Sequence, residues 1–187
     1  MTTSRRFPLL LSLVFALLSF GCASRPETEI NSATKSKQMA EEQRASEFAP
    51  TELQAAKETW DQAQAALQKE DYSQAQTLLQ KARSRYDKAH EVAKAKRDRI
   101  LKDAKGLMDA TDARYKILKD KFEADKEKIP AATKKEIEDA FVEIDKGVAD
   151  AKAKLDKGDY NDARTAANNT MRLVYDAEQA LQGKKKG

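Results

Sequence analysis

The sequence contains few of the residues that form cross-links, tight turns or reactive sites. Its 187 residues include one cysteine, one histidine, four prolines and six glycines, and aromatic residues make up 6%. A single cysteine excludes an intrachain disulfide, so packing alone must hold the fold together. Alanine, lysine, glutamate, glutamine and leucine dominate, and this composition predicts long helices and leaves no candidate strands.

Residue groups typical of catalysis are also missing. The sequence has no glycine-rich phosphate loop, metal-ligand cluster or nucleophile elbow. Apart from Cys22 near the N-terminus, the chain has no cysteine to pair with the sole histidine, His90, and we expect His90 to be a partly covered surface residue. Carboxylates have basic neighbours one helical turn away, which leaves no evident acid–base pair. We therefore expect a protein that is not an enzyme and has no catalytic residue, cofactor or metal.

The charges are nearly balanced. The formal net charge is +4, and without Arg5 and Arg6 of the N-terminal segment 33 basic residues face 31 acidic ones. Three of these positive charges are Lys184 to Lys186, in a basic tail at 183–187. A near-neutral body argues against a nucleic-acid partner, which requires a basic face. The tail could contact anionic cell wall or act as a solubilising end, and the sequence does not decide between these.

The N-terminus has the pattern of an export signal. Two arginines precede an apolar run of 14 residues, Phe7 to Phe20, which is shorter than the roughly 20 residues of a membrane-spanning helix. The run ends at Gly21 and Cys22, which resemble the processing site of bacterial lipoproteins, where cleavage precedes a cysteine that is then acylated. An ordinary cleavage after Ala23, which would discard the cysteine, is the alternative.

The lipoprotein resemblance implies that residues 1–21 are removed and that acyl chains on Cys22, palmitate among them, bind the chain to a membrane. Ala23 and Ser24 are not the aspartate that marks inner-membrane retention, so the resemblance implies the bacterial outer membrane, facing the periplasm. Residues 22–49 are polar, and we expect them to be a tether that is partly helical near 36–47.

After Pro50, apolar residues recur every three or four positions and predict two antiparallel, alanine-rich helical hairpins, at 50–105 and 106–182. Capping boxes place helix starts at Thr51 and Thr133.

No proline interrupts residues 72–128, so one long central helix should join the two hairpins. Its apolar stripe changes phase near residues 101–106, which predicts that the buried face turns around the helix there. The expected fold class is therefore all-α.

Each hairpin turns at nearly the same nine residues. LQKEDYSQA, residues 67–75, and LDKGDYNDA, residues 155–163, lie 88 positions apart, and the seam residues of the hairpins match at this offset. The predicted hinge residues are Asp71 and Tyr72 in the first hairpin, and Gly158, Asp159 and Tyr160 in the second. The aspartate can cap the new helix. Glycine adopts a positive φ without strain, so Glu70, which stands in the first hinge where the second has Gly158, should be strained.

The hinge, with alanines on both sides, resembles the helical hairpin of tetratricopeptide repeats. A closer resemblance, over Phe48 to Arg97, is to an uncharacterised family of bacterial lipoproteins in which an APxEL opening leads to a GDYxxA hairpin. Members of that family sometimes precede an OmpA-like domain, for which this chain has no room. The resemblance implies a location in the cell envelope and no known activity.

Two groups of residues are candidates for binding. Met171, Leu173 and Tyr175 widen the apolar surface of the last helix. This surface either packs against the first hairpin or docks a second protomer or an envelope protein. The aromatic residues Trp60, Tyr86 and Tyr115 could line a cleft between the hairpins, although residues at this spacing are more often core.

The function that we expect is a structural spacer or adaptor, anchored in the outer membrane, whose helix faces bind an envelope protein or the cell wall. The alternative is a periplasmic ligand-binding module. The sequence names neither the partner nor the oligomeric state.

Overall fold

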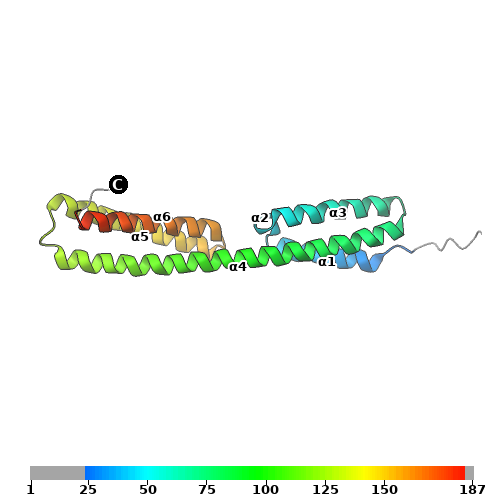
Figure 1. Cartoon of the computed structure of the whole chain (residues 1–187), viewed down its shortest axis with the longest axis horizontal. Coiled ribbons are helices and arrows are strands. Elements are labelled where there is room, and N and C mark those ends of the chain that lie inside the picture. The colour runs from blue at the N-terminus through cyan, green and yellow to red at the C-terminus, as the bar shows by residue number, and fades with distance from the viewer. Residues whose placement is uncertain (1–23, 184–187) are drawn as a thin grey trace, which may run out of the picture.

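The computed structural model describes residues 24–183 as helices arranged in a rod (Figure 1). The helices are α1 (Glu27–Glu42), α2 (Ala45–Phe48), α3 (Pro50–Gln68), α4 (Tyr72–Asp125), α5 (Ala131–Asp156) and α6 (Tyr160–Leu181). No strand occurs within residues 24–183. The all-α class and the long central helix are thus confirmed.

Helix α4 runs through both halves of the rod, and its buried residues form one straight stripe. It has 54 residues, about 81 Å at 1.5 Å per residue. The buried positions are Ala75, Leu79, Ala82, Tyr86, Ala89, Ala93, Ala104, Thr111, Tyr115, Leu118 and Phe122. Half-buried Arg97 and Ile100 continue the spacing between Ala93 and Ala104. The predicted turn of the buried face at 101–106 was therefore wrong.

Arg97 explains the error. Its aliphatic stem occupies a stripe position, and its guanidinium donates a hydrogen bond of 2.5 Å to Gln43 Oε1 at the end of α1. A charged residue in the sequence therefore looks like a break in a stripe that is continuous in space.

The first unit consists of α1, α2, α3 and the N-terminal half of α4. Residues 36–47, expected to be partly helical, do lie largely in helices. However, α1 also covers 27–35 and packs along α4, where it buries Ala33, Ser36 and Ala40, so this segment is not a tether. The two helices are parallel, since Gln76 contacts Glu29 and His90 contacts Met39. Small residues at three- and four-residue spacing form this interface, and they give a weak apolar signal in the sequence.

Both predicted capping boxes were wrong. Helix α3 begins at Pro50 and α5 begins at Ala131, before Thr51 and Thr133 respectively, and neither has a side-chain cap. Proline at the first helical position sets a helical φ and has no N–H group to leave unpaired, so it starts α3 without a cap.

The second unit consists of the C-terminal half of α4 with α5 and α6. Here α6 packs against both α4 and α5, as α4 packs against both α1 and α3 in the first unit. The repeat therefore includes a further helix beyond each predicted hairpin: α1 flanks the first hairpin as the end of α4 flanks the second (Figure 1).

The two hairpins differ in which helix carries threonine and which carries a small residue at one pair of equivalent positions. In the second, a Cβ added to Gly147 on α5 would lie 2.3 Å from Thr170 Oγ1 on α6. The residues 88 positions earlier are Thr59 on α3 and Ala82 on α4, both buried. At these two equivalent positions, threonine and the small residue have therefore exchanged helices between the copies.

Replacing Gly147 with alanine should lower the free energy of unfolding by about 1–3 kcal/mol, because the new methyl group forces α5 and α6 apart. Gly106→Ala is the matched control: a Cβ there meets no atom within 4 Å, so better helix propensity should raise stability by up to about 1 kcal/mol. Urea unfolding measures both. A loss of stability in the two variants alike would contradict the close contact.

Candidate functional site: the inter-unit junction and the α5–α6 groove

The first hinge lies at a free end of the rod (Figure 1). Asp71 is the N-cap residue of α4, and its carboxylate accepts a hydrogen bond of 3.1 Å from the Gln74 N–H. Tyr72 is half-buried. Glu70 has a φ of +58°, the left-handed conformation that costs a non-glycine residue energy.

The second hinge lies in the middle of the rod, against the first unit. Gly158 has a φ of +82°, and its carbonyl oxygen accepts a hydrogen bond of 2.7 Å from Arg44 Nη1. Asp159 is the N-cap residue of α6 but makes no side-chain cap; its carboxylate lies 3.7 Å from the Arg44 guanidinium. Tyr160 packs against the core cluster that contains Phe48.

Arg44 is therefore the centre of an inter-unit junction, which we define as Arg44, Glu47, Phe48 and the second hinge. Arg44 itself has a φ of +56° and pairs with Glu47 at 2.5 Å. Glu47 also accepts a hydrogen bond of 3.4 Å from Asn161 on α6. Sequence reasoning missed Arg44, because it lies in the segment expected to be a tether and its partners in the second hinge are over 110 residues away.

The aromatic residues proposed for a cleft are in the cores of the two units. Tyr86 is fully buried and makes an edge contact with half-buried Trp60, with ring centroids 6.5 Å apart. Tyr115 is 6% exposed and donates a hydrogen bond of 3.1 Å to the Phe141 carbonyl oxygen. These rings hold helices together and do not line a cleft between the units.

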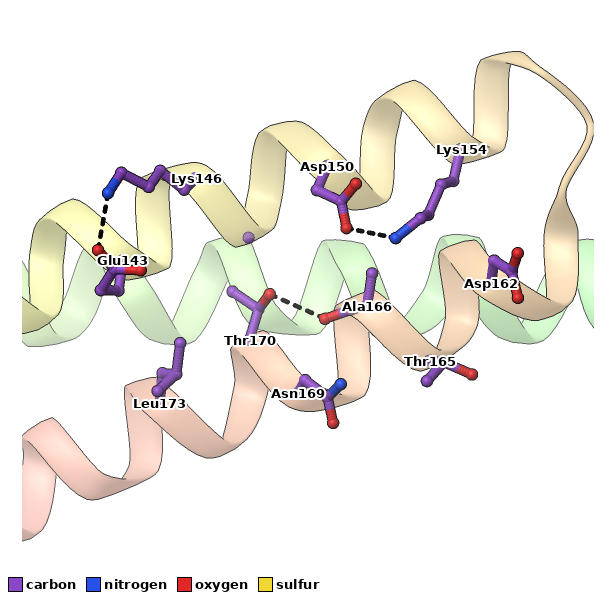
Figure 2. Close-up of a pocket in the computed structure, with 11 residues that line it drawn as sticks. Glu143, Lys146, Asp150, Lys154, Asp162, Thr165, Ala166, Asn169, Thr170 and Leu173 are labelled. Atoms are coloured by element: carbon purple, nitrogen blue, oxygen red, sulfur yellow. Dashed lines mark hydrogen bonds and ion pairs between the residues drawn. The ribbon is translucent and has the colours of Figure 1, made fainter.

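The described surface contains an open groove between α5 and α6, with a volume of about 410 Å³ (Figure 2). Along its α5 side, Lys146 pairs with Glu143 at 2.8 Å and Lys154 with Asp150 at 2.5 Å. Its floor is the Gly147–Thr170 contact, where the Thr170 hydroxyl donates to the Ala166 carbonyl oxygen. Asp162, Thr165, Asn169 and Leu173 line the α6 side.

Leu173 leaves this groove open. The residue 88 positions earlier is Arg85, whose guanidinium crosses from α4 to α3 and donates to Ala55 O at 2.8 Å and Thr59 Oγ1 at 2.5 Å. Leucine cannot form this bridge, and Leu173 remains 37% exposed. The groove of the second unit therefore offers an apolar side chain between polar rims.

The structure does not bring Met171, Leu173 and Tyr175 together. Leu173 lines the groove on one flank of α6, whereas Tyr175 is 50% exposed and its ring lies 5.6 Å from the Arg114 guanidinium of α4. Arg114 also pairs with Glu178 at 2.6 Å. Met171 is half-buried. The expected single apolar patch is thus two separate sites, with Leu173 in the groove.

The sole histidine joins two helices of the first unit. His90 Nδ1 lies 3.1 Å from the Met39 carbonyl oxygen, a contact that joins α4 to α1. Residues 24–183 contain no cluster of acidic, histidine or cysteine side chains that could hold a metal. None of the described helices is long and apolar enough to cross a membrane. Cys22, residues 1–21 and Lys184 to Lys186 lie outside the described residues.

Comparison with known proteins finds a similarity to a domain in the first part of the chain. Residues 28–115 match a domain of unknown function (DUF4398). The match begins in α1 and ends in the middle of α4, so it covers the first unit, including the segment that the sequence suggested was a tether. No curated protein and no solved structure matches the chain.

Tyr86→Phe should stabilise the protein by about 1 kcal/mol, because the buried Tyr86 hydroxyl has no hydrogen-bond partner among the described residues.

Burial, with the negative charges of Glu41 and Asp61, raises the pKa of Tyr86 to about 12. The folded state thus keeps a proton that the unfolded chain loses near pH 10. The free energy of unfolding of the wild type is therefore unaffected by this group below pH 10 and falls as the pH rises from 10 towards 12. Urea midpoints should fall more steeply above pH 10 in the wild type than in the variant; equal slopes would contradict the burial of a neutral hydroxyl.

Arg44→Ala should loosen the second hinge, because it removes the donor to the Gly158 carbonyl and the cation beside Asp159. We expect the amides of residues 158–161 to exchange hydrogen about fivefold faster, which corresponds to a loss of about 1 kcal/mol. Arg25→Ala is the control, since Arg25 pairs with Glu27 at an exposed site away from the junction. Unchanged exchange at the hinge in Arg44→Ala would show that the junction does not depend on this side chain.

Proposed function

We propose that this protein is a lipoprotein of the bacterial outer membrane, anchored through Cys22, that acts in the periplasm as a structural spacer and adaptor. The observation that carries the proposal is the rod: α4 passes through both units, and the Arg44 junction joins them end to end along it (Figure 1). Such a body sets the distance between an anchor at one end and binding faces further along.

The position of the anchor supports this arrangement. The described chain begins three residues before α1, at the end of the rod that also holds the first hinge (Figure 1). A lipid on Cys22 would therefore sit close to this end. The groove beside Leu173 lies in the second unit, on the far side of the junction, so the anchor and the candidate binding face are separated by the length of the first unit.

The groove is also the feature that favours the alternative function, a ligand-binding module. Its volume of about 410 Å³ would admit a small molecule. However, it is open along its length, and its lysines are already neutralised by carboxylates of the same helix. A long, shallow surface of this kind suits the side chains of an extended or helical protein segment better than it suits a small ligand.

A photo-crosslinking amino acid at Leu173 should yield a discrete adduct with an envelope protein or with cell wall in intact cells producing the full-length chain. The matched control is Val142, which is 53% exposed on the outer side of α5 and outside the groove. Cys22→Ser should release the protein from the membrane and remove the adduct. Equal adducts at both positions, or membrane association that persists in Cys22→Ser, would contradict the proposal.

A further inference from the structure

One face of α4 has no partner within the described chain. Both units pack on the side of α4 that carries its buried stripe, so the opposite side is exposed along the helix (Figure 1). We call this side the outward face. It consists of exposed residues at three- and four-residue spacing: Lys88, Glu91, Ala95, Arg99, Lys102, Gly106, Asp109, Ala113 and Ile117.

Within seven residues of Gly106, the charges on this face have opposite signs on its two sides. Arg99 and Lys102 precede it, and Asp109 follows it, with Asp112 at the edge of the face. Lys102, Asp109 and Asp112 have no ion pair or hydrogen bond with the described residues. Arg99 is 84% exposed and reaches Asp103 only at 4.0 Å. These charges are thus free for another molecule, unlike the paired lysines of the groove.

We propose that the outward face binds the same face of a second copy of this chain, with the two α4 helices antiparallel and Gly106 near the two-fold axis. With the axis between Lys105 and Gly106, Lys102 and Asp109 lie at equal distances from it, and so do Arg99 and Asp112. Each of these pairs therefore meets across the contact, and each occurs twice. Parallel helices would set Lys102 against Lys102. The charge order along the face therefore selects a second copy in one direction.

The uncharged residues of the face fit the same arrangement. Ile117, which is 53% exposed, lies within one residue of the position opposite Ala95 of the other copy, where it loses contact with water. Gly106 lies where the helices cross, and a Cβ there meets no atom within 4 Å, so no side chain of its own molecule blocks a close approach. Ala113 extends the small-residue surface on the same face.

The antiparallel arrangement places the two N-termini at opposite ends of the pair. If Cys22 is acylated, as the proposed function requires, an anchored pair lies along the membrane with one anchor at each end. This orientation rests on the proposed function, whereas the contact between the outward faces does not.

Disulfide formation tests the contact in the purified full-length protein treated with copper phenanthroline, in a Cys22→Ser background so that the introduced cysteine is the only thiol. Gly106→Cys should give a disulfide-linked dimer, because its two sulfurs meet at the axis. Ser84→Cys is the matched control: it is exposed on the same side of α4, but its two copies would lie about 66 Å apart at 1.5 Å per residue, far beyond the Cα separation of about 7 Å that a disulfide allows. Equal dimer yields would overturn the proposal.

Charge reversal in the Gly106→Cys protein tests the pairing directly. Lys102→Glu and Asp109→Lys should each slow dimer formation about tenfold, since each turns two attractive pairs into repulsive ones. A mixture of the two variants, carrying different tags, should form the mixed dimer at the rate of the unreversed protein, because every pair in it is attractive again. Lys152→Glu on α5 is the charge control and should have no effect. A mixed dimer as slow as the single variants would overturn the proposal, and none of these outcomes depends on acylation of Cys22.

Discussion

The structure depends on one constraint, which is the unbroken buried stripe of α4. Alternating steps of three and four residues average close to the 3.6 residues of a helical turn, so a stripe that keeps this rhythm stays on one side of a straight helix. Because the stripe runs from Ala75 to Phe122, both units must pack on the same side of α4. The rod, the position of the junction and the exposed outward face all follow from that.

The duplicated hairpins have diverged where their surroundings differ. The first hinge is free at the end of the rod, and it retains Glu70 with a strained φ of +58°. The second hinge is held by Arg44, and there Gly158 adopts a positive φ without strain and offers its carbonyl oxygen as the acceptor. A similar divergence separates Arg85, which bridges α3 and α4, from Leu173, which leaves the groove open. The second copy has thus acquired the features that face other parts of the molecule or solvent.

Much of this fold could be predicted from the sequence, because the hairpins and α4 have strong local signals in apolar spacing and in the hinge residues. The packing of α1 against α4 could not be predicted, since its buried residues Ala33, Ser36 and Ala40 are small and contribute little apolar surface, and the sequence around them is polar. The continuity of α4 was obscured by Arg97, whose stem packs while its charge reaches Gln43. The junction had no local signal at all, because Arg44 meets Gly158 only after the whole chain has folded.

The pairing of charges separates the structural surfaces from those left for binding. Along the helices most close ion pairs join residues three or four positions apart, such as Lys126 with Glu123 and Lys154 with Asp150, and exposed pairs of this kind add little stability. Their effect is to leave those surfaces neutral and solvated. On the outward face, Lys102 and Asp109 make no close ion pair with the described residues, so their field extends to approaching molecules. A surface whose unpaired charges reverse sign about Gly106 is complementary to itself, and this property distinguishes it from the rest of the rod.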